Sequence, residues 1–264
     1  MAPEDEQIRG RPRRAAAEVA GRRIDAIELE GDDRLAAIVM LHEGLGSVEL
    51  WRDFPLALHR ATGRRLIAFS RFGHGHSQTS PWPRDVTGHH HREALTMLPE
   101  LLQALGVERP LLVGHSDGAS IALIHAGRHP VSGLVLLAPH VFVEPLTLDS
   151  IRETRDNYLR GELRQRMSRY HDDVDAAFWG WSDMWLHRDF RTWNLEAEAA
   201  LVTAPTLLIQ GADDPYGTLE QLRRIEARIR GPVQRLAVGG GHSPHIDAPD
   251  EVVSAVTRFA SARL

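Results

Sequence analysis

The stretch Leu111-Leu112-Val113-Gly114-His115-Ser116-Asp117-Gly118-Ala119-Ser120-Ile121-Ala122-Leu123 decides the fold of this chain. An apolar run meets a Gly-x-Ser-x-Gly pentapeptide, and a helix-forming run follows it. This order predicts a strand, a sharp turn and a helix, with Ser116 in a strained conformation that lifts its hydroxyl above the end of a sheet. Gly114 and Gly118 are required because a Cβ atom at either position would collide with the neighbouring strand or helix. The start of the helix would aim the backbone N–H of Asp117 at a developing oxyanion.

A Gly-x-Ser-x-Gly alone is a weak signal, because it also occurs in ordinary loops, but the strand before it and the helix after it favour a nucleophile elbow. A serine hydroxyl becomes a nucleophile only when a base takes its proton and a further group orients that base. Asp213 and Asp214 follow the apolar run 206–210, and His242 follows the last strand-like segment. Catalytic groups in open α/β sheets lie at the carboxyl ends of strands, so these side chains can meet at Ser116.

Composition excludes several kinds of chemistry. The 264-residue chain has no cysteine, and all 31 of its basic residues are arginine. Disulfides, thiol catalysis and zinc–thiolate sites are therefore excluded, as are Schiff-base, pyridoxal phosphate and P-loop chemistry. The net charge of −5 gives no nucleic-acid signature, and no apolar stretch reaches 18 residues. We expect a cytoplasmic protein with a small-molecule substrate and no nucleic-acid or membrane partner; a homodimer is left open.

Strand-like and helix-like segments alternate along most of the chain, which is typical of a mostly parallel α/β sheet flanked by helices. Residues 142–200 lack a convincing strand and hold four of the six tryptophans, so we predict a helical cap inserted after the sixth strand. Residues 48–62 are expected to form one helix. The expected organisation is a disordered lead-in over 1–16, a core over 17–141 and 201–264, and a cap over 142–200.

Four motifs resemble those of the α/β-hydrolase superfamily, in its cap-bearing branch of esterases, haloperoxidase-like enzymes and meta-cleavage-product hydrolases. One is the elbow at Ser116. His42-Glu43-Gly44-Leu45-Gly46-Ser47 stands where the family has an oxyanion-loop His-Gly. Arg71-Phe72-Gly73-His74-Gly75-His76-Ser77 resembles its Arg-x-Gly-x-Gly-x-Ser loop, and Gly241-His242-Ser243-Pro244-His245-Ile246-Asp247-Ala248-Pro249 resembles its Gly-His segment. The similarity covers roughly residues 20 to 262.

The resemblance implies a role for each site residue. The family places the acid third after the strand-ending glycine, which carries over to Asp214 and leaves Asp213 as a turn residue or helix cap. Glu144 is a less favoured alternative acid. With Ser116 as nucleophile and His242 as base, the backbone N–H groups of Gly44 and Asp117 would form the oxyanion hole. No metal or organic cofactor is expected.

A serine nucleophile disfavours haloalkane dehalogenases and epoxide hydrolases, which use aspartate at that position. Acyl transfer to water remains, on an ester, thioester, lactone or amide. The alternatives are carbon–carbon bond hydrolysis of the meta-cleavage type and a cofactor-free perhydrolase or haloperoxidase. An alternative of another class is a catalytically silent binding module, although the complete Ser-Asp-His set argues against it.

Other residues allow two interpretations each. Trp179, Trp181 and Trp185 either line a pocket for an apolar or aromatic group or bury the cap helices. His245 is interpreted as pocket lining or packing, and His115 as structural. Residues 89–91 are three consecutive histidines, which we interpret as a solvated loop and not as a metal cluster, because adjacent residues cannot all face one ion.

Glu43 departs from the family, whose residue after the loop histidine is glycine. A carboxylate beside Gly44 would repel a developing oxyanion in a low-dielectric cleft. We favour an ion pair between Glu43 and Arg71 that fixes the two loops bidentately. In the alternative, Glu43 faces the pocket and accepts a hydrogen bond from the substrate.

Overall fold

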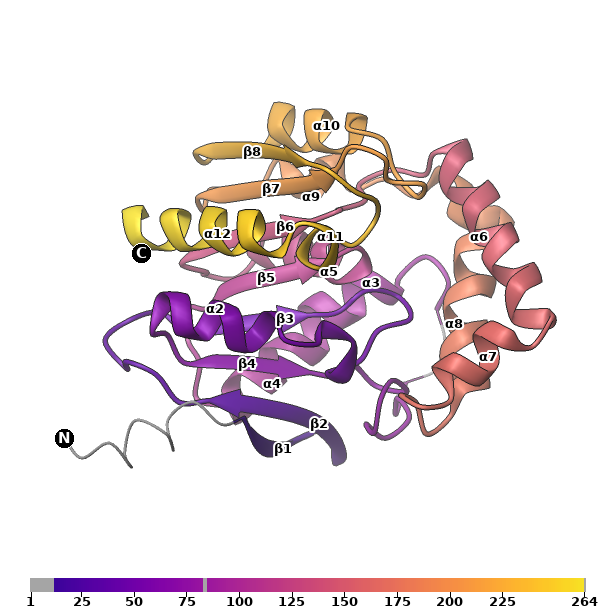
Figure 1. Cartoon of the computed structure of the whole chain (residues 1–264), viewed down its shortest axis with the longest axis horizontal. Coiled ribbons are helices and arrows are strands. Elements are labelled where there is room, and N and C mark those ends of the chain that lie inside the picture. The colour runs from indigo at the N-terminus through magenta and orange to yellow at the C-terminus, as the bar shows by residue number, and fades with distance from the viewer. Residues whose placement is uncertain (1–11, 83–84, 264) are drawn as a thin grey trace.

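The computed structural model describes residues 12–82 and 85–263, and within them eight strands form one sheet in the order β1-β2-β4-β3-β5-β6-β7-β8 (Figure 1). The strands are β1 Arg13–Val19, β2 Arg22–Leu29, β3 Ile38–Leu41, β4 Leu66–Phe69, β5 Leu111–His115, β6 Gly133–Leu137, β7 Thr206–Gly211 and β8 Val233–Val238. β2 pairs antiparallel with β1 and β4, and all other pairs are parallel. The predicted mostly parallel α/β architecture is confirmed.

Helices cover both faces of the sheet, which explains why its central strands are buried at every position. In β3, Ile38 and Met40 pack in the core shared with α2 (Phe54–Thr62) and α12 (Pro249–Arg263). Val39 and Leu41 face the opposite core. The helices on that side are α3 His89–Arg92, the π-helical segment η2 Glu93–Met97, α4 Leu98–Ala104, α5 Asp117–Ala126 and α10 Glu220–Arg228.

Two boundaries differ from the sequence prediction. β1 begins at Arg13, inside the predicted lead-in, because Ala17 and Val19 alternate toward the core while Arg14 pairs with Asp25 of β2 at 2.8 Å. Residues 1–11, the rest of that lead-in, lie outside the described residues. The single helix predicted over 48–62 is divided into the 3₁₀ segment η1 (Glu49–Trp51) and α2, since Pro55 is tolerated only in a first helical turn.

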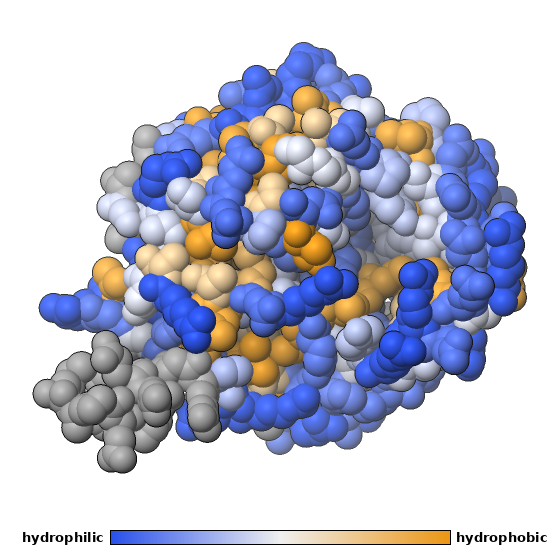
Figure 2. Space-filling model, viewed as in Figure 1, coloured by the Kyte–Doolittle hydropathy of each residue, from blue (hydrophilic) through white to orange (hydrophobic). Residues whose placement is uncertain are grey.

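The helical insertion follows β6, the sixth strand, as predicted. It contains α6 Pro145–Leu159, α7 Glu162–Met167, α8 Val174–Leu186, η3 Arg188–Thr192 and α9 Glu196–Ala199. Helices α6, α7 and α8 stand across one end of the sheet, on the right of Figure 1. Tyr158 and Phe178 stack at 3.6 Å between α6 and α8, which joins the cap helices to one another. The outer face of the cap is largely hydrophilic, and the surface is hollowed between cap and core (Figure 2).

No helix in the described ranges is both long and apolar enough to span a lipid bilayer.

Candidate active site

Ser116 occupies a sharp turn between β5 and α5, with φ 52° and ψ −118°. Positive φ is strained for a residue with a side chain, and it is held here by the Ser116 N–H, which donates to the Leu137 carbonyl at 2.9 Å. A Cβ atom on Gly114 would lie 2.5 Å from the Gly118 carbonyl oxygen, and one on Gly118 would lie 2.1 Å from that of Leu41. Both glycines are therefore required by backbone contacts, as the sequence predicts.

The structure brings Ser116, His242 and Asp214 together from the ends of three strands. Ser116 Oγ lies 2.9 Å from His242 Nε2, and His242 Nδ1 lies 2.9 and 2.8 Å from the two oxygens of Asp214. Asp213 is exposed and only its backbone is held, through its N–H to the Gly240 carbonyl. Glu144 does not contact His242, because its carboxylate accepts bonds from Thr218 and Gln221.

Hydrogen bonds hold the Asp214 carboxylate in a position from which it can orient His242. Its Oδ2 accepts from Gln210 Nε2 at 3.0 Å, and its Oδ1 accepts from the Tyr216 N–H at 2.8 Å. Burial alone would raise the pKa of Asp214, but the contact with His242 and the bond from Tyr216 outweigh it and lower the pKa. An ionised Asp214 favours the His242 tautomer protonated at Nδ1, which leaves the Nε2 lone pair facing the Ser116 hydroxyl.

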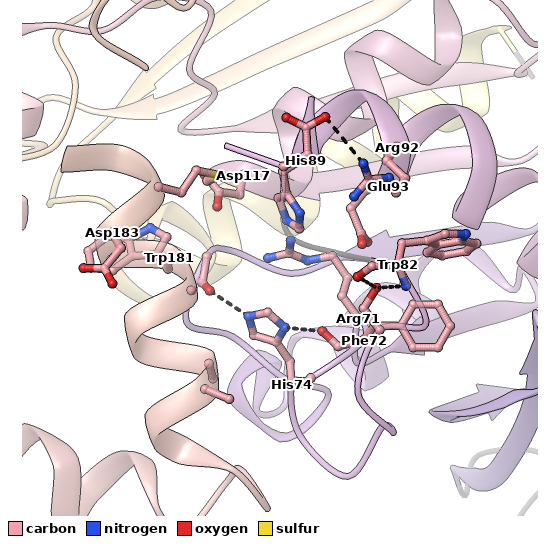
Figure 3. A pocket seen from close by; sticks show the side chains of 18 of the residues that line it. Arg71, Phe72, His74, Trp82, His89, Arg92, Glu93, Asp117, Trp181 and Asp183 are labelled. Atoms are coloured by element: carbon pink, nitrogen blue, oxygen red, sulfur yellow. Dashed lines mark hydrogen bonds and ion pairs between the residues drawn. The ribbon is translucent and has the colours of Figure 1, made fainter. Parts of the chain in front are cut away.

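A cavity of about 370 Å³ lies between the core and the cap (Figure 3). Ser116, Asp214 and His242 are not among its lining residues, but Asp117, which follows Ser116 in the chain, is. Gly44, from the loop after β3, and Asp117, the first residue of α5, both line it. Its apolar wall is formed by Phe72, Trp82, Val86, Trp181 and Met184. Trp181 lies so close to Gly44 that a Cβ there would stand 2.1 Å from its ring. Glycine at position 44 therefore allows the cap to reach the core at this point.

The three cap tryptophans have different surroundings. Trp181 lines the cavity, as one of the two interpretations holds. Trp185 is fully buried, and its Nε1 donates to Asp117 Oδ1 at 3.1 Å. Trp179 is not among the cavity residues; its ring packs edge-on against Tyr158 and lies under the guanidinium of Arg155. Trp181 and Trp185 lie one turn apart on the same side of α8 and differ in their position along the helix, whereas Trp179 lies on another face.

The side chain of Asp117 joins the elbow to two other elements. Besides the bond from Trp185 of the cap, its Oδ1 lies 3.4 Å from Nε2 of His90 in α3. Burial works to raise the pKa of Asp117, but the charges of His90, Arg71 and His140 outweigh it and hold the pKa well below its usual range. Oδ1 is thus turned toward donors, while Oδ2 lies beside Gly44 and the residue borders the cavity.

The prediction of a solvated loop over residues 89–91 is wrong. These residues form helix α3, so their side chains point in three directions. His89 lines the cavity, His90 is buried between Trp185 and Trp193, and His91 lies 2.9 Å from Glu198. The sequence carried only a weak signal for this, because histidine runs are rarely buried.

The two loops beside the elbow are joined, but not by the predicted ion pair. Arg71 Nη2 donates to the Glu43 backbone carbonyl at 2.9 Å, and His74 Nε2 lies 3.0 Å from the Gly44 carbonyl. The Glu43 carboxylate is 27% exposed and lies 3.4 Å from His115 Nδ1, outside the cavity lining. Burial opposes its ionisation, but His115 and His42 outweigh burial and lower the pKa of Glu43. The alternative of a pocket-facing Glu43 is therefore not what the structure shows either.

His245 packs and does not line the cavity. Its ring lies 4.9 Å from Trp51, 5.3 Å from Phe54 and 4.9 Å from His115. This cluster lies behind His242, whose ring is 5.3 Å from that of His115. His115 also contacts the His242 backbone carbonyl through Nε2 at 2.7 Å, so the two histidines support the position of His242.

Residues 38–255 match the alpha/beta hydrolase family. The chain belongs to this family. Membership makes the protein a hydrolase of the alpha/beta fold. The mouse protein described as sn-1-specific diacylglycerol lipase ABHD11 is 27% identical over 263 residues, covering 88% of this chain and 83% of that protein. The 2-hydroxymuconate semialdehyde hydrolase of Pseudomonas sp. (strain CF600) is 28% identical over 176 residues, covering 64% of this chain and 59% of that protein.

Solved structures show the same fold at lower identity. The 2-hydroxy-6-oxo-6-phenylhexa-2,4-dienoate hydrolase of Rhodococcus sp. strain RHA1 is 14% identical, with a TM-score of 0.79 over 96% of this chain and 100% of that chain. The enol-lactonase of Burkholderia xenovorans LB400 is 18% identical, with a TM-score of 0.72 over 94% and 100% of the two chains. These structures share the architecture of core and sheet with this chain.

Proposed function

We propose that this protein is a serine hydrolase that cleaves a small carboxylic ester through an acyl-enzyme on Ser116. The observation that carries the proposal is the unbroken chain of contacts from Ser116 Oγ through His242 to Asp214, at 2.9 and 2.8 Å. A hydroxyl, an imidazole and an ionised carboxylate in this order are the parts that activate a serine.

The mechanism has two halves. Ser116 Oγ attacks the ester carbonyl carbon while His242 Nε2 takes its proton, and the imidazolium then gives that proton to the departing alkoxide. Water attacks the resulting acyl-enzyme, His242 takes a proton from it, and the carboxylic acid leaves as Ser116 regains its hydrogen. Asp214 holds the imidazole and stabilises its positive charge throughout. Thioesters, lactones and amides would follow the same steps with a different leaving atom.

The backbone N–H groups of Gly44 and Asp117 bind the oxyanion in this proposal, and each such donor is worth about 3 kcal/mol of barrier lowering. Both residues border the cavity, so a carbonyl placed between them extends its acyl group along Trp181 and the other apolar side chains. The cap of residues 142–200 would thereby cover the acyl group and exclude water. On the side chain of Asp117, Oδ1 is directed to Trp185 and His90.

The test is hydrolysis of p-nitrophenyl esters of graded chain length. Ser116→Ala should lower kcat/KM by about 10⁴-fold or more, because the nucleophile is removed. Ser120→Ala is the matched control: this serine is also buried in α5, but its hydroxyl donates to the His140 carbonyl at 2.6 Å. Wild-type activity that survives in Ser116→Ala would contradict the proposal, whereas an equal loss in both variants would indicate damage to α5.

A further inference from the structure

Arg71 is a buried cation without a counter-ion. Its side chain is 2% exposed, and across the described ranges no carboxylate oxygen lies within 4.0 Å of its guanidinium. Nη2 donates to the Glu43 carbonyl at 2.9 Å, and Nε has no hydrogen-bond partner. Burying an unpaired charge costs several kcal/mol, so a cation in this condition needs an explanation.

The guanidinium of Arg71 lies in the cavity, below His89 and on the side of Asp117 (Figure 3). Two acidic groups that border the same cavity, Asp117 and Glu93, interact with its charge at longer range but form no ion pair with it. Asp117 Oδ1 is held by Trp185 and His90, while Oδ2 lies beside Gly44. Burial raises the pKa of Glu93, and the positive charges of Arg71 and Arg92 offset this rise only in part. Arg71 therefore adds a buried positive charge to a cavity that has apolar walls and is also lined by Asp85, Glu93, Asp117 and Asp183.

Arg92 borders the same cavity but differs from Arg71 in its exposure and in having a carboxylate partner. Its side chain is 26% exposed and lies 3.4 Å from the Asp85 carboxylate. Arg71 alone of the two is both buried and without a carboxylate partner, which makes it the group that a bound anion would satisfy. Guanidinium N–H groups suit carboxylate oxygens in geometry as well as in charge.

Resting on the proposed serine hydrolase, we propose that Arg71 binds a carboxylate at the far end of the acyl group. The preferred substrates are then monoesters or monothioesters of dicarboxylic acids. The ester carbonyl lies at Gly44 and Asp117, the methylene chain lies along Phe72 and Trp181, and the free carboxylate accepts hydrogen bonds from Arg71. A cavity of about 370 Å³ is of the size that holds such a small acyl group.

The experiment compares two substrates that differ only in charge: the mono-p-nitrophenyl ester of adipic acid and the same ester of its monoamide. Wild-type kcat/KM should be at least about tenfold higher for the carboxylate, mainly through KM, because hydrogen bonds from a charged donor discriminate by this amount or more. In Arg71→Gln the ratio should fall to one or below, since the neighbouring acidic groups remain. In Arg92→Gln the preference should persist.

Using the ratio removes the effect of Arg71 on the oxyanion loop, because a disturbed loop slows both esters alike. Equal wild-type kcat/KM for the two esters would overturn the inference, as would a preference that persists in Arg71→Gln or is lost only in Arg92→Gln. If Arg71→Gln does not fold, calorimetric binding of adipate and adipamide to the wild type decides: tighter binding of adipate supports the inference, and equal binding overturns it. Failure of the proposed function is a separate result, namely hydrolysis that does not depend on Ser116.

Discussion

On the core side of the site, Ser116, Asp214 and His242 each follow a strand, whereas on the cap side Trp181 and Trp185 lie one helical turn apart on α8. Paired parallel strands fix where their carboxyl ends lie, so the side chains that follow them meet within hydrogen-bond distance. A helix fixes only spacing, and the positions of Trp181 and Trp185 along α8 decide that Trp181 borders the cavity while Trp185 is buried on Asp117. The core side therefore fixes the positions of the three candidate catalytic residues. On the cap side, Trp185 packs against the core and Trp181 lines the cavity.

The largest effect is expected on the core side, at Asp214. Asp214→Asn keeps the shape of the side chain but removes the charge that holds the His242 tautomer, so kcat for ester hydrolysis should fall about 10³- to 10⁴-fold. Asp213→Asn is the matched control, since Asp213 is exposed one residue away, and kcat should change little. Steady-state kinetics with one p-nitrophenyl ester measures both. Losses in the reverse order would assign the orienting role to Asp213.

The next effect is expected at Trp185, on stability. Trp185→Ala should lower the free energy of unfolding by about 3–5 kcal/mol, because a large buried ring is removed. Trp185→Phe keeps most of the ring but loses the N–H that Asp117 accepts, and it should cost about 1–3 kcal/mol. Urea unfolding measures both variants. Wild-type stability in Trp185→Ala, with KM alone changed, would instead make Trp185 a recognition residue like Trp181.

Trp181 should show the opposite behaviour. Trp181→Ala removes apolar cavity wall, so KM for p-nitrophenyl octanoate should rise about tenfold more than KM for the acetate. Trp179→Ala is the control, because Trp179 is absent from the cavity lining and its loss should affect both esters equally. A lowered melting temperature with equal changes in the two KM values would show that Trp181 only packs the cap.

The smallest effect per residue is expected on stability at acidic pH, through the buried histidines. Burial lowers the pKa of His74, His140 and His245 to about 3 and that of His125 to about 4. Between these values and the ordinary pKa near 6.5 the unfolded chain binds protons that the folded chain does not, so stability rises with pH. As pH falls from 7 to 5, each such histidine should cost up to about 1.4 kcal/mol per pH unit.

Urea unfolding at pH 7, 6 and 5 measures this slope. His125→Gln should reduce this pH dependence by about the contribution of one histidine. That reduction would identify the buried histidines as the source of the proton uptake. A free energy of unfolding that stays constant over this range would mean that these histidines titrate alike in the folded and unfolded protein, and so that their pKa values are not lowered by burial.

The same contrast explains what the sequence could predict. The elbow, the mostly parallel sheet, the insertion after the sixth strand and the meeting of Ser116, Asp214 and His242 all follow from motifs at strand ends. The choice of Asp214 over Asp213 follows from the resemblance, since the family places the acid third after the strand-ending glycine.

Predictions failed where the direction of a side chain decided the outcome. Arg71 reaches the Glu43 carbonyl and not its carboxylate, a difference of a few ångströms that spacing cannot resolve. His90 is buried because α3 starts at residue 89, although consecutive histidines suggest a solvated loop. The start of β1 was placed too late because its first inward-facing residues include alanines, which give a weak strand signal. Each error concerns a contact between elements and not the existence of the core elements.

The most direct measurement is covalent labelling with a fluorophosphonate, which reacts only with a serine activated by a base. The intact mass of the wild type should increase by one adduct per chain, and peptide mapping should place it on Ser116. The adduct should be absent from Ser116→Ala and strongly slowed in His242→Ala, while Ser120→Ala should be labelled like the wild type. Stoichiometric labelling that persists in Ser116→Ala, or that maps to another serine, would contradict this account of the site.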